Sequence, residues 1–170
     1  MATLVFNASP LIYLSKVSLI EHIKELPEKK YIPQSVYDEV VTKGKELGVA
    51  DAFKVDKLIR ENVIKIKSPS DDGFTKHLLE NPKIHCADAE VLSLAKELHA
   101  IALMDDEESR AMADLERIPN HGTIYLLFCF LRKAIITKEE FIDKLNEMIR
   151  EGWRCSTELY TKIIKALDSF

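Results

Sequence analysis

Short β-rich runs alternate with longer helical patterns along most of the chain, and this alternation limits the folds open to it. Short β-favouring runs occur at residues 3–6, 30–32 and 101–104, with helical patterns between them. Residues 62–67 alternate apolar and polar, as a half-exposed edge strand would. Strands that alternate with helices are joined by right-handed crossovers. We therefore expect an α/β fold: a three-layer α/β/α sandwich with helices on both faces of a central parallel sheet.

The helical patterns differ in their boundary signals. Two capping boxes predict helix starts, one formed by Ser18 with Glu21 and one by Thr137 with Glu140. Residues 34–47 read as one amphipathic helix. The last third of the chain contains helical patterns only.

The chain of 170 residues favours a single domain. We expect residues 1–170 to form one unit with two parts. Residues from about 1 to 120 would form the α/β core. Residues from about 121 to 170 would form C-terminal helices that pack on it.

Charge and cysteine content narrow the class of protein. The net charge of −4 gives no overall signal for nucleic-acid binding, although local lysine and arginine clusters could hold a nucleic-acid backbone. The three cysteines are widely spaced and form no paired motif, which argues against a zinc site. No signal-peptide pattern and no long apolar run is present, so we expect a cytoplasmic protein without a membrane span.

Polar residues follow two of the predicted strands at their carboxyl ends. Asn7 and Ser9 follow the run at 3–6, and Asp105 and Asp106 follow the run at 101–104. Ligands of parallel α/β sheets bind at this edge of the sheet. These four side chains are therefore candidate site residues.

Three further acidic residues lie near helix starts: Glu39, Asp88 and Glu90. Carboxylates from separate segments that converge repel one another unless a cation lies between them. Oxygen-only ligands of this kind suit Mg²⁺ or Mn²⁺, which support phosphodiester cleavage.

Each candidate also has a purely structural explanation. Asp88 could be a carboxylate favoured by a helix dipole, and Glu39 a solvated helix residue. Asp105 and Asp106 could start the following helix, and Asn7 and Ser9 could cap the helix after the first strand. Spacing alone does not assemble these residues into a site.

Taken in order, however, the segments resemble the PIN-domain family of metal-dependent ribonucleases, and are most similar to its VapC-like prokaryotic subgroup. The similarity runs through "VFNASPLIYLSKVSLIEHI", "YIPQSVYDEVV" and "ADAEVLSLAKELHAIALMDDEESRAMA", and continues into "IPNHGTIYLLF" and "EGWRCSTELY". It covers the chain nearly end to end. Each motif is short, so the ordered set carries the resemblance.

The resemblance implies a PIN-type endoribonuclease that cleaves single-stranded RNA, the toxin of a toxin–antitoxin pair. It implies a Rossmann-like α/β/α sandwich, Mg²⁺ or Mn²⁺ as cofactor, a small antitoxin protein as partner, and a homodimer. The residues that it assigns to catalysis are Glu39, Asp88 and Asp105. The metal would be held by Asp88, Asp105, Asp106, Glu39 and Asn7. Supporting roles would fall to Ser9, Glu90, Arg110 and Thr123.

Asn7 departs from the family pattern, which has an aspartate at this position. An amide offers a carbonyl oxygen but no negative charge, so we expect weaker metal binding and reduced activity. The third acidic segment departs less, since Ala87-Asp88 replaces the usual Gly-Glu and keeps the charge. A second hypothesis is a catalytically silent PIN fold that binds RNA or a protein. A third is a phosphotransfer domain with Asp105 or Asp106 as the phosphate acceptor, for which no lysine partner is evident.

Overall fold

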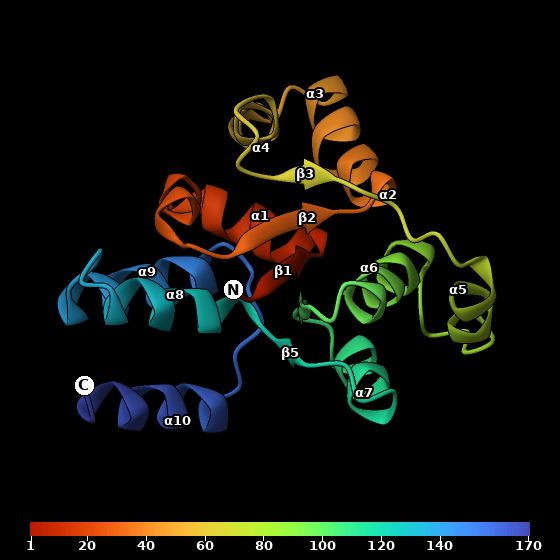
Figure 1. Cartoon of the computed structure of the whole chain (residues 1–170). Helices are drawn as coiled ribbons and strands as arrows, with labels where there is room; N and C mark the ends of the chain where they lie inside the picture. Colours follow the sequence, from red (N-terminus) through yellow and green to blue (C-terminus); the bar gives the residue numbers. More distant parts are fainter. The chain divides into compact units, whose positions relative to one another are not determined.

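The computed structural model describes residues 1–170 and contains one parallel sheet of five strands. The strands are β1 (Thr3–Phe6), β2 (Lys29–Ile32), β3 (Lys65–Ile66), β4 (Ile101–Leu103) and β5 (Asn120–His121). Their order across the sheet is β3-β2-β1-β4-β5, and every neighbouring pair is parallel. The α/β class expected from the alternation of runs is confirmed. In Figure 1 the arrowheads of β1, β2 and β3 point the same way.

The central strand β1 is apolar because both of its faces are covered. Leu4, Val5 and Phe6 are at most 2% exposed. In register, Leu4 faces Ile101 of β4 and Lys30 of β2. Burial of such side chains stabilises the sheet by about 1.5–3 kcal/mol each.

The strand order places a switch point between β1 and β4. From β1 the chain adds β2 and then β3 on one side, and it later adds β4 and β5 on the other side. Right-handed crossovers in opposite directions put their helices on opposite faces of the sheet, which gives three layers. Ligands of such sheets bind outside the carboxyl ends of the two strands at the switch point. Here those ends are Asn7 and Met104–Asp105.

Helices connect the strands of the sheet. They are α1 (Ala8–Lys16), η1 (Ile20–Glu25), α2 (Gln34–Tyr37), η2 (Asp38–Thr42), α3 (Lys43–Glu46), α4 (Ala50–Arg60), α5 (Asp72–Leu79), α6 (Cys86–Glu97) and α7 (Glu107–Leu115). Helix α1 lies against α4, whereas α6 lies against β1 and β4.

The segment at 34–47 is not the single regular helix that its pattern predicts. A π-helical turn, η2, interrupts it and carries Glu39. Such turns insert an extra residue into a helix and often occur at functional sites. Periodicity could not reveal it because the apolar face remains continuous through Val40 and Val41, which are both buried.

The capping box expected at Ser18 is wrong. Ser18 has a φ of 61° and its backbone N–H donates to Ser15 O, so it forms the left-handed end of α1. The next segment, η1, is a short 3₁₀ helix whose N-cap, Leu19, makes no side-chain cap bond. The second capping box, Thr137 with Glu140, is confirmed. Two further differences concern strands: β3 is shorter than the predicted run at 62–67, and β5 was not expected.

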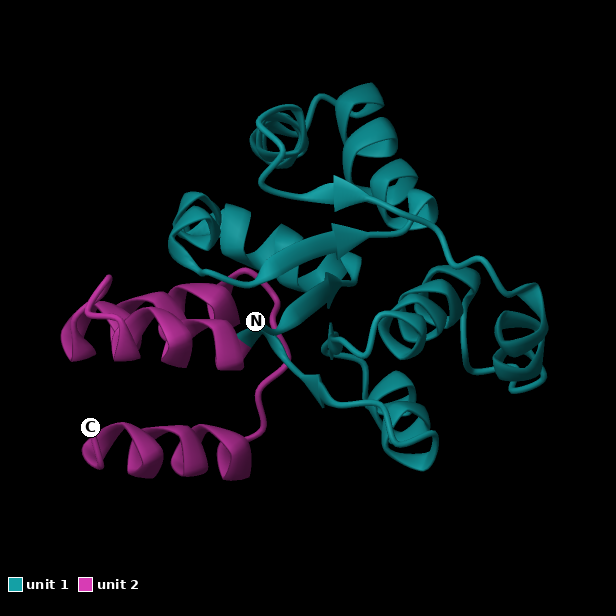
Figure 2. Ribbon diagram, viewed as in Figure 1, with its two compact units in different colours: residues 1–123 teal, residues 124–170 magenta.

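The chain divides into two compact units, residues 1–123 and 124–170 (Figure 2). The second unit contains most of α8 (Thr123–Arg132), together with α9 (Lys138–Arg150) and α10 (Thr157–Asp168). Three of its aromatic rings form a cluster: the centroid of the Phe128 ring lies 4.7 Å from that of Phe141 and 5.6 Å from that of Phe170. None of the helices in the structure combines the length and apolarity needed to cross a bilayer.

Candidate functional site

Asn7 lies directly after β1 and points its side chain at the start of α6. Its backbone N–H donates to Leu103 O at 2.9 Å, which extends the β1–β4 ladder by one residue. Its amide nitrogen Nδ2 donates to Asp88 Oδ1 at 2.7 Å. Its amide oxygen accepts from the Ala8 N–H at 2.9 Å. Because a backbone N–H can only donate, the Asn7 oxygen must face Ala8 and its NH₂ group must face Asp88.

Asp88 is held from two sides in the first turn of α6. Its Oδ2 accepts from the His85 backbone N–H at 3.2 Å, which is one half of a capping box, and its Oδ1 accepts from Asn7. Asn7 and Asp88 are each 8% exposed. The same carboxylate therefore caps the N-terminus of α6 and faces the end of β1.

Asp105, directly after Met104 at the end of β4, accepts three hydrogen bonds. The Ser9 hydroxyl donates to Oδ2 at 2.8 Å, and the Thr123 hydroxyl donates to the same oxygen at 2.7 Å. The Thr123 backbone N–H donates to Oδ1 at 2.7 Å. The structure thus brings Ser9, Asp105 and Thr123 together from three separate segments.

Asp106 has a different environment from its neighbour. Its Oδ2 accepts from the backbone N–H and the hydroxyl of Ser109, both at 2.9 Å, so Asp106 is the N-cap of α7. Of the two adjacent aspartates, Asp105 is the one bonded to the β1–α1 junction.

The two glutamates predicted from the sequence make other contacts. Glu90 follows Asp88 by two residues on α6, where it accepts hydrogen bonds from the Ser35 hydroxyl and, at 3.7 Å, from the Cys86 thiol. It thereby joins α6 to α2. Glu39 is exposed in the π-helical turn η2.

The donor set fits a hard divalent cation in chemistry, because every polar group at the switch point apart from the Asn7 NH₂ offers oxygen. However, this set of donors carries little negative charge, and its side chains do not converge on one point. No three histidine, cysteine, aspartate or glutamate side chains lie close enough to hold an ion. Where a ligand charge is expected, Asn7 presents N–H donors to Asp88. Asp88 and Asp105 are the charged oxygen donors at this edge.

Arg110 on α7 lies near Asp105, at the carboxyl-end edge of the sheet. Its Nε donates to Asn120 Oδ1 at 3.0 Å, and Asn120 Nδ2 donates to Asp114 Oδ1 at 2.7 Å. A Cβ atom on Gly122 would lie 2.9 Å from Asp105 Oδ1 and 3.6 Å from Arg110 Nη1. Asn120, Asp114 and Gly122 were not predicted as site residues. No clear sequence pattern indicated them. Asn120 lies on β5, which has only two residues and therefore no periodicity.

His121 is the next residue of β5. Loss of hydration lowers its pKa from 6.5, and the positive charge of Arg110 lowers it further. The imidazole therefore favours the neutral form beside the arginine.

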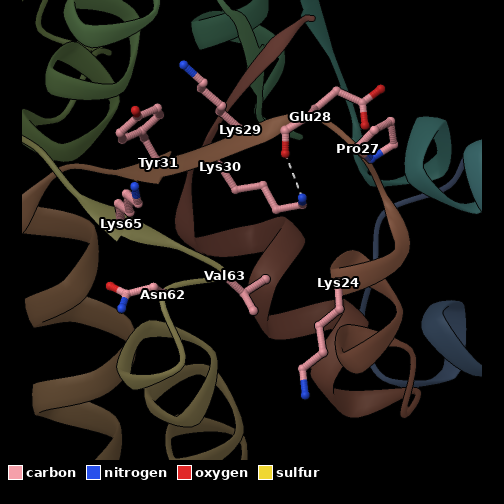
Figure 3. A pocket seen from close by; sticks show the side chains of 9 residues that line it. All are labelled: Lys24, Pro27, Glu28, Lys29, Lys30, Tyr31, Asn62, Val63 and Lys65. Atoms are coloured by element: carbon pink, nitrogen blue, oxygen red, sulfur yellow. Dashed lines mark hydrogen bonds between the residues drawn. The ribbon is translucent and has the colours of Figure 1, made fainter.

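A basic hollow of about 330 Å³ lies around the start of β2 and is a separate feature (Figure 3). Its lining includes Lys24, Lys30 and Lys65. Lys30 is 6% exposed and its Nζ donates to Leu26 O and Glu28 O, both at 2.6 Å. Burial lowers the pKa of this lysine. Lys30 thus ties a turn to a strand and is not part of a solvated basic face.

Comparison with known families identifies the chain. The sequence profile of a family described as a PIN domain (DUF3368) matches residues 3–169. The chain belongs to the PIN-domain family. PIN domains form a nuclease family and generally depend on divalent metals, so the edge between β1 and β4 is the candidate nuclease site of this PIN domain.

Solved structures support the same fold. The crystal structure of PAE2754 from Pyrobaculum aerophilum aligns with a TM-score of 0.54 and 18% identity, over 79% of this chain and 98% of that one. At this identity the likeness concerns the fold alone. No curated protein matches the sequence.

Proposed function

We propose that this PIN domain is a Mg²⁺- or Mn²⁺-dependent endoribonuclease that cleaves single-stranded RNA, with an activity lowered by Asn7. The observation that carries the proposal is the pair of fixed carboxylates at the switch point. Asp88 is fixed beside the end of β1, and Asp105 is bonded to Ser9 of the adjoining helix. This is where α/β sheets of this topology bind ligands.

Asp88 and Asp105 would hold the cation, with Glu39, Asp106 and the Asn7 oxygen as further oxygen donors. When bound, a divalent cation would lower the pKa of a coordinated water and neutralise charge on the scissile phosphate. Asp106 would first have to break its hydrogen bonds with Ser109, and the Asn7 oxygen its hydrogen bond with Ala8. We therefore rank these two below Asp88 and Asp105.

The protein groups around the carboxylates act by holding them in place. Ser9 and Thr123 restrain Asp105 through both of its oxygens, while His85 and Asn7 restrain Asp88. A restrained carboxylate loses less entropy when a ligand binds. Glu90 supports the start of α6 through its bond to Ser35.

Family membership also supports a biological setting. We propose a cytoplasmic toxin of the VapC-like subgroup, acting as a homodimer and inhibited by a small antitoxin protein. Light scattering of the purified chain would report a mass near two copies if the dimer forms. Induced expression alone would arrest growth, and co-expression of the antitoxin would reverse the arrest.

One observation favours a second candidate function, a silent PIN domain that binds RNA or a protein. The Asn7–Asp88 hydrogen bond satisfies the buried carboxylate without a metal ion. The Asn7→Asp variant separates the two. Strong metal binding and activity gained by the variant over an inert parent would favour the silent function. Tight metal binding by the parent would exclude it.

The decisive experiment is Mn²⁺-dependent cleavage of single-stranded RNA by the wild-type chain and by Asp88→Ala. We expect the wild type to cleave slowly and the variant not at all. Thermal unfolding of both proteins controls for loss of the fold, and Asp105→Asn provides a second, milder variant. Equal cleavage by wild type and Asp88→Ala would refute the assignment.

A further inference from the structure

Arg110 and Asp114 lie four residues apart on α7, a spacing at which an arginine and an aspartate can form an ion pair. No such pair forms here. Asn120 lies between them instead, accepting from Arg110 Nε at 3.0 Å and donating to Asp114 Oδ1 at 2.7 Å. The neutral amide therefore holds both side chains and keeps their charges apart.

This arrangement leaves the terminal nitrogens of Arg110 without a protein acceptor. Its hydrogen bond to Asn120 uses Nε alone, and Arg110 forms no ion pair. Arg110 is also exposed. A guanidinium fixed at Nε presents its other N–H groups in a rigid fork, which matches the oxygens of a phosphate.

Gly122 shows that this fork borders the candidate nuclease site. The position of a Cβ atom on Gly122 lies 3.6 Å from Arg110 Nη1 and 2.9 Å from Asp105 Oδ1. Because position 122 has no side chain, the Asp105 carboxylate and the Arg110 guanidinium both lie close to the Gly122 backbone. A phosphate paired with the Arg110 guanidinium would therefore lie near Asp105.

We infer that Arg110, oriented by Asn120, is the residue that binds an RNA phosphate next to Asp105. This inference rests on the proposed function, since it takes RNA as the ligand. On a chain of net charge −4, an unpaired cation at the site edge offsets repulsion of a polyanion. Asn120 is a positioning residue that prevents Asp114 from capturing the arginine.

Binding of fluorescein-labelled single-stranded RNA of mixed sequence, measured by anisotropy in EDTA, tests this without requiring cleavage. We expect Arg110→Met to weaken binding about tenfold. Its slope of log K against log salt should be smaller by about 0.7, the value for one phosphate contact on a single strand. Lys76→Met removes the same charge from an exposed position on α5. It should have a much smaller effect on both the affinity for RNA and the salt slope.

The positioning role has its own test by rescue. Asn120→Ala should weaken RNA binding because Arg110 can then pair with Asp114. The double variant Asn120→Ala/Asp114→Asn should recover binding, since no acid remains to capture the arginine. A merely structural role for Asn120 predicts no recovery, and thermal unfolding of each variant checks the fold.

The outcomes separate this inference from the proposed function. RNA binding by the wild type that Arg110→Met and Lys76→Met weaken equally would overturn the inference and leave the nuclease proposal standing. Absence of RNA binding by the wild type in EDTA would overturn the inference, and the Mn²⁺-dependent cleavage assay would decide the nuclease proposal separately. Normal binding without cleavage by the wild type would leave Arg110 as a phosphate-binding residue of a silent domain.

Discussion

The Asn7 amide donates to Asp88 Oδ1 at 2.7 Å and thereby joins the end of β1 to the first turn of α6. An aspartate at position 7 would face Asp88 with a second carboxylate oxygen at this distance. Two like charges so close require a proton or a cation between them. Asn7 thus provides Asp88 with a neutral hydrogen-bond donor, so that no proton or cation is needed between the two side chains.

Asn7→Asp should therefore make stability depend on metal. Without metal we expect a loss of about 1–3 kcal/mol, because a buried hydrogen bond is replaced by repulsion. Added Mn²⁺ should restore the loss and raise the melting temperature more than in the wild type, since a ligand that binds only the folded state stabilises it. Calorimetry with and without Mn²⁺ measures both effects.

Asn7→Leu is the matched control, because it removes the hydrogen bond without adding a charge. It should be destabilised as well, and Mn²⁺ should not rescue it. Rescue of the leucine variant to the same extent would show that the metal acts elsewhere.

The fold was largely predictable because its signals are local. The apolar run at 3–6 predicts a buried strand with Asn7 at its carboxyl end, and β1 is that strand. The strand β5 was missed because Asn120 and His121 alone carry no periodicity. Ser18 was misread because a left-handed residue and an N-cap serine look the same in sequence.

The site was predictable only in part. Strand ends indicate Asn7 and Asp105, since all parallel strands end at one edge of the sheet. The direction of the Asn7 amide depends on a bond to Ala8 and a partner 81 residues away, which no local pattern contains. The separation of Arg110 from Asp114 by Asn120 likewise depends on the tertiary fold, because helical spacing alone would allow an ion pair.

Thr123→Val tests how Asp105 is restrained. The valine loses the hydroxyl that donates to Oδ2 but keeps the backbone N–H that donates to Oδ1. We expect a loss of about 0.5–1.5 kcal/mol in urea unfolding. Ser9→Ala removes the other donor to the same oxygen. The double variant should lose more than the sum of the two, because Oδ2 then has no donor. Strict additivity would mean that the two hydroxyls do not share this oxygen.

Gly122→Ala tests the close approach of Asp105 to the Gly122 backbone. The new Cβ would lie 2.9 Å from Asp105 Oδ1, so the carboxylate has to move. We expect destabilisation of about 1–3 kcal/mol from this overpacking. In an Asp105→Ala background the same substitution should cost much less, since the conflicting oxygen is gone. An equal cost in both backgrounds would place the conflict outside Asp105.

His121 should make stability depend on pH. Its folded pKa is lowered from 6.5, first by loss of hydration and then by the charge of Arg110. The unfolded chain therefore binds the proton more readily, so the His121 contribution is complete above pH 6.5 and is lost as pH falls toward the folded pKa. Arg110→Met should raise the His121 pKa, as followed by NMR titration of the imidazole, and should flatten this part of the stability profile. Lys76→Met should leave the titration unchanged. An unshifted His121 pKa in Arg110→Met would mean that the guanidinium does not lie beside the ring in solution, and the phosphate-binding fork would then lack its position.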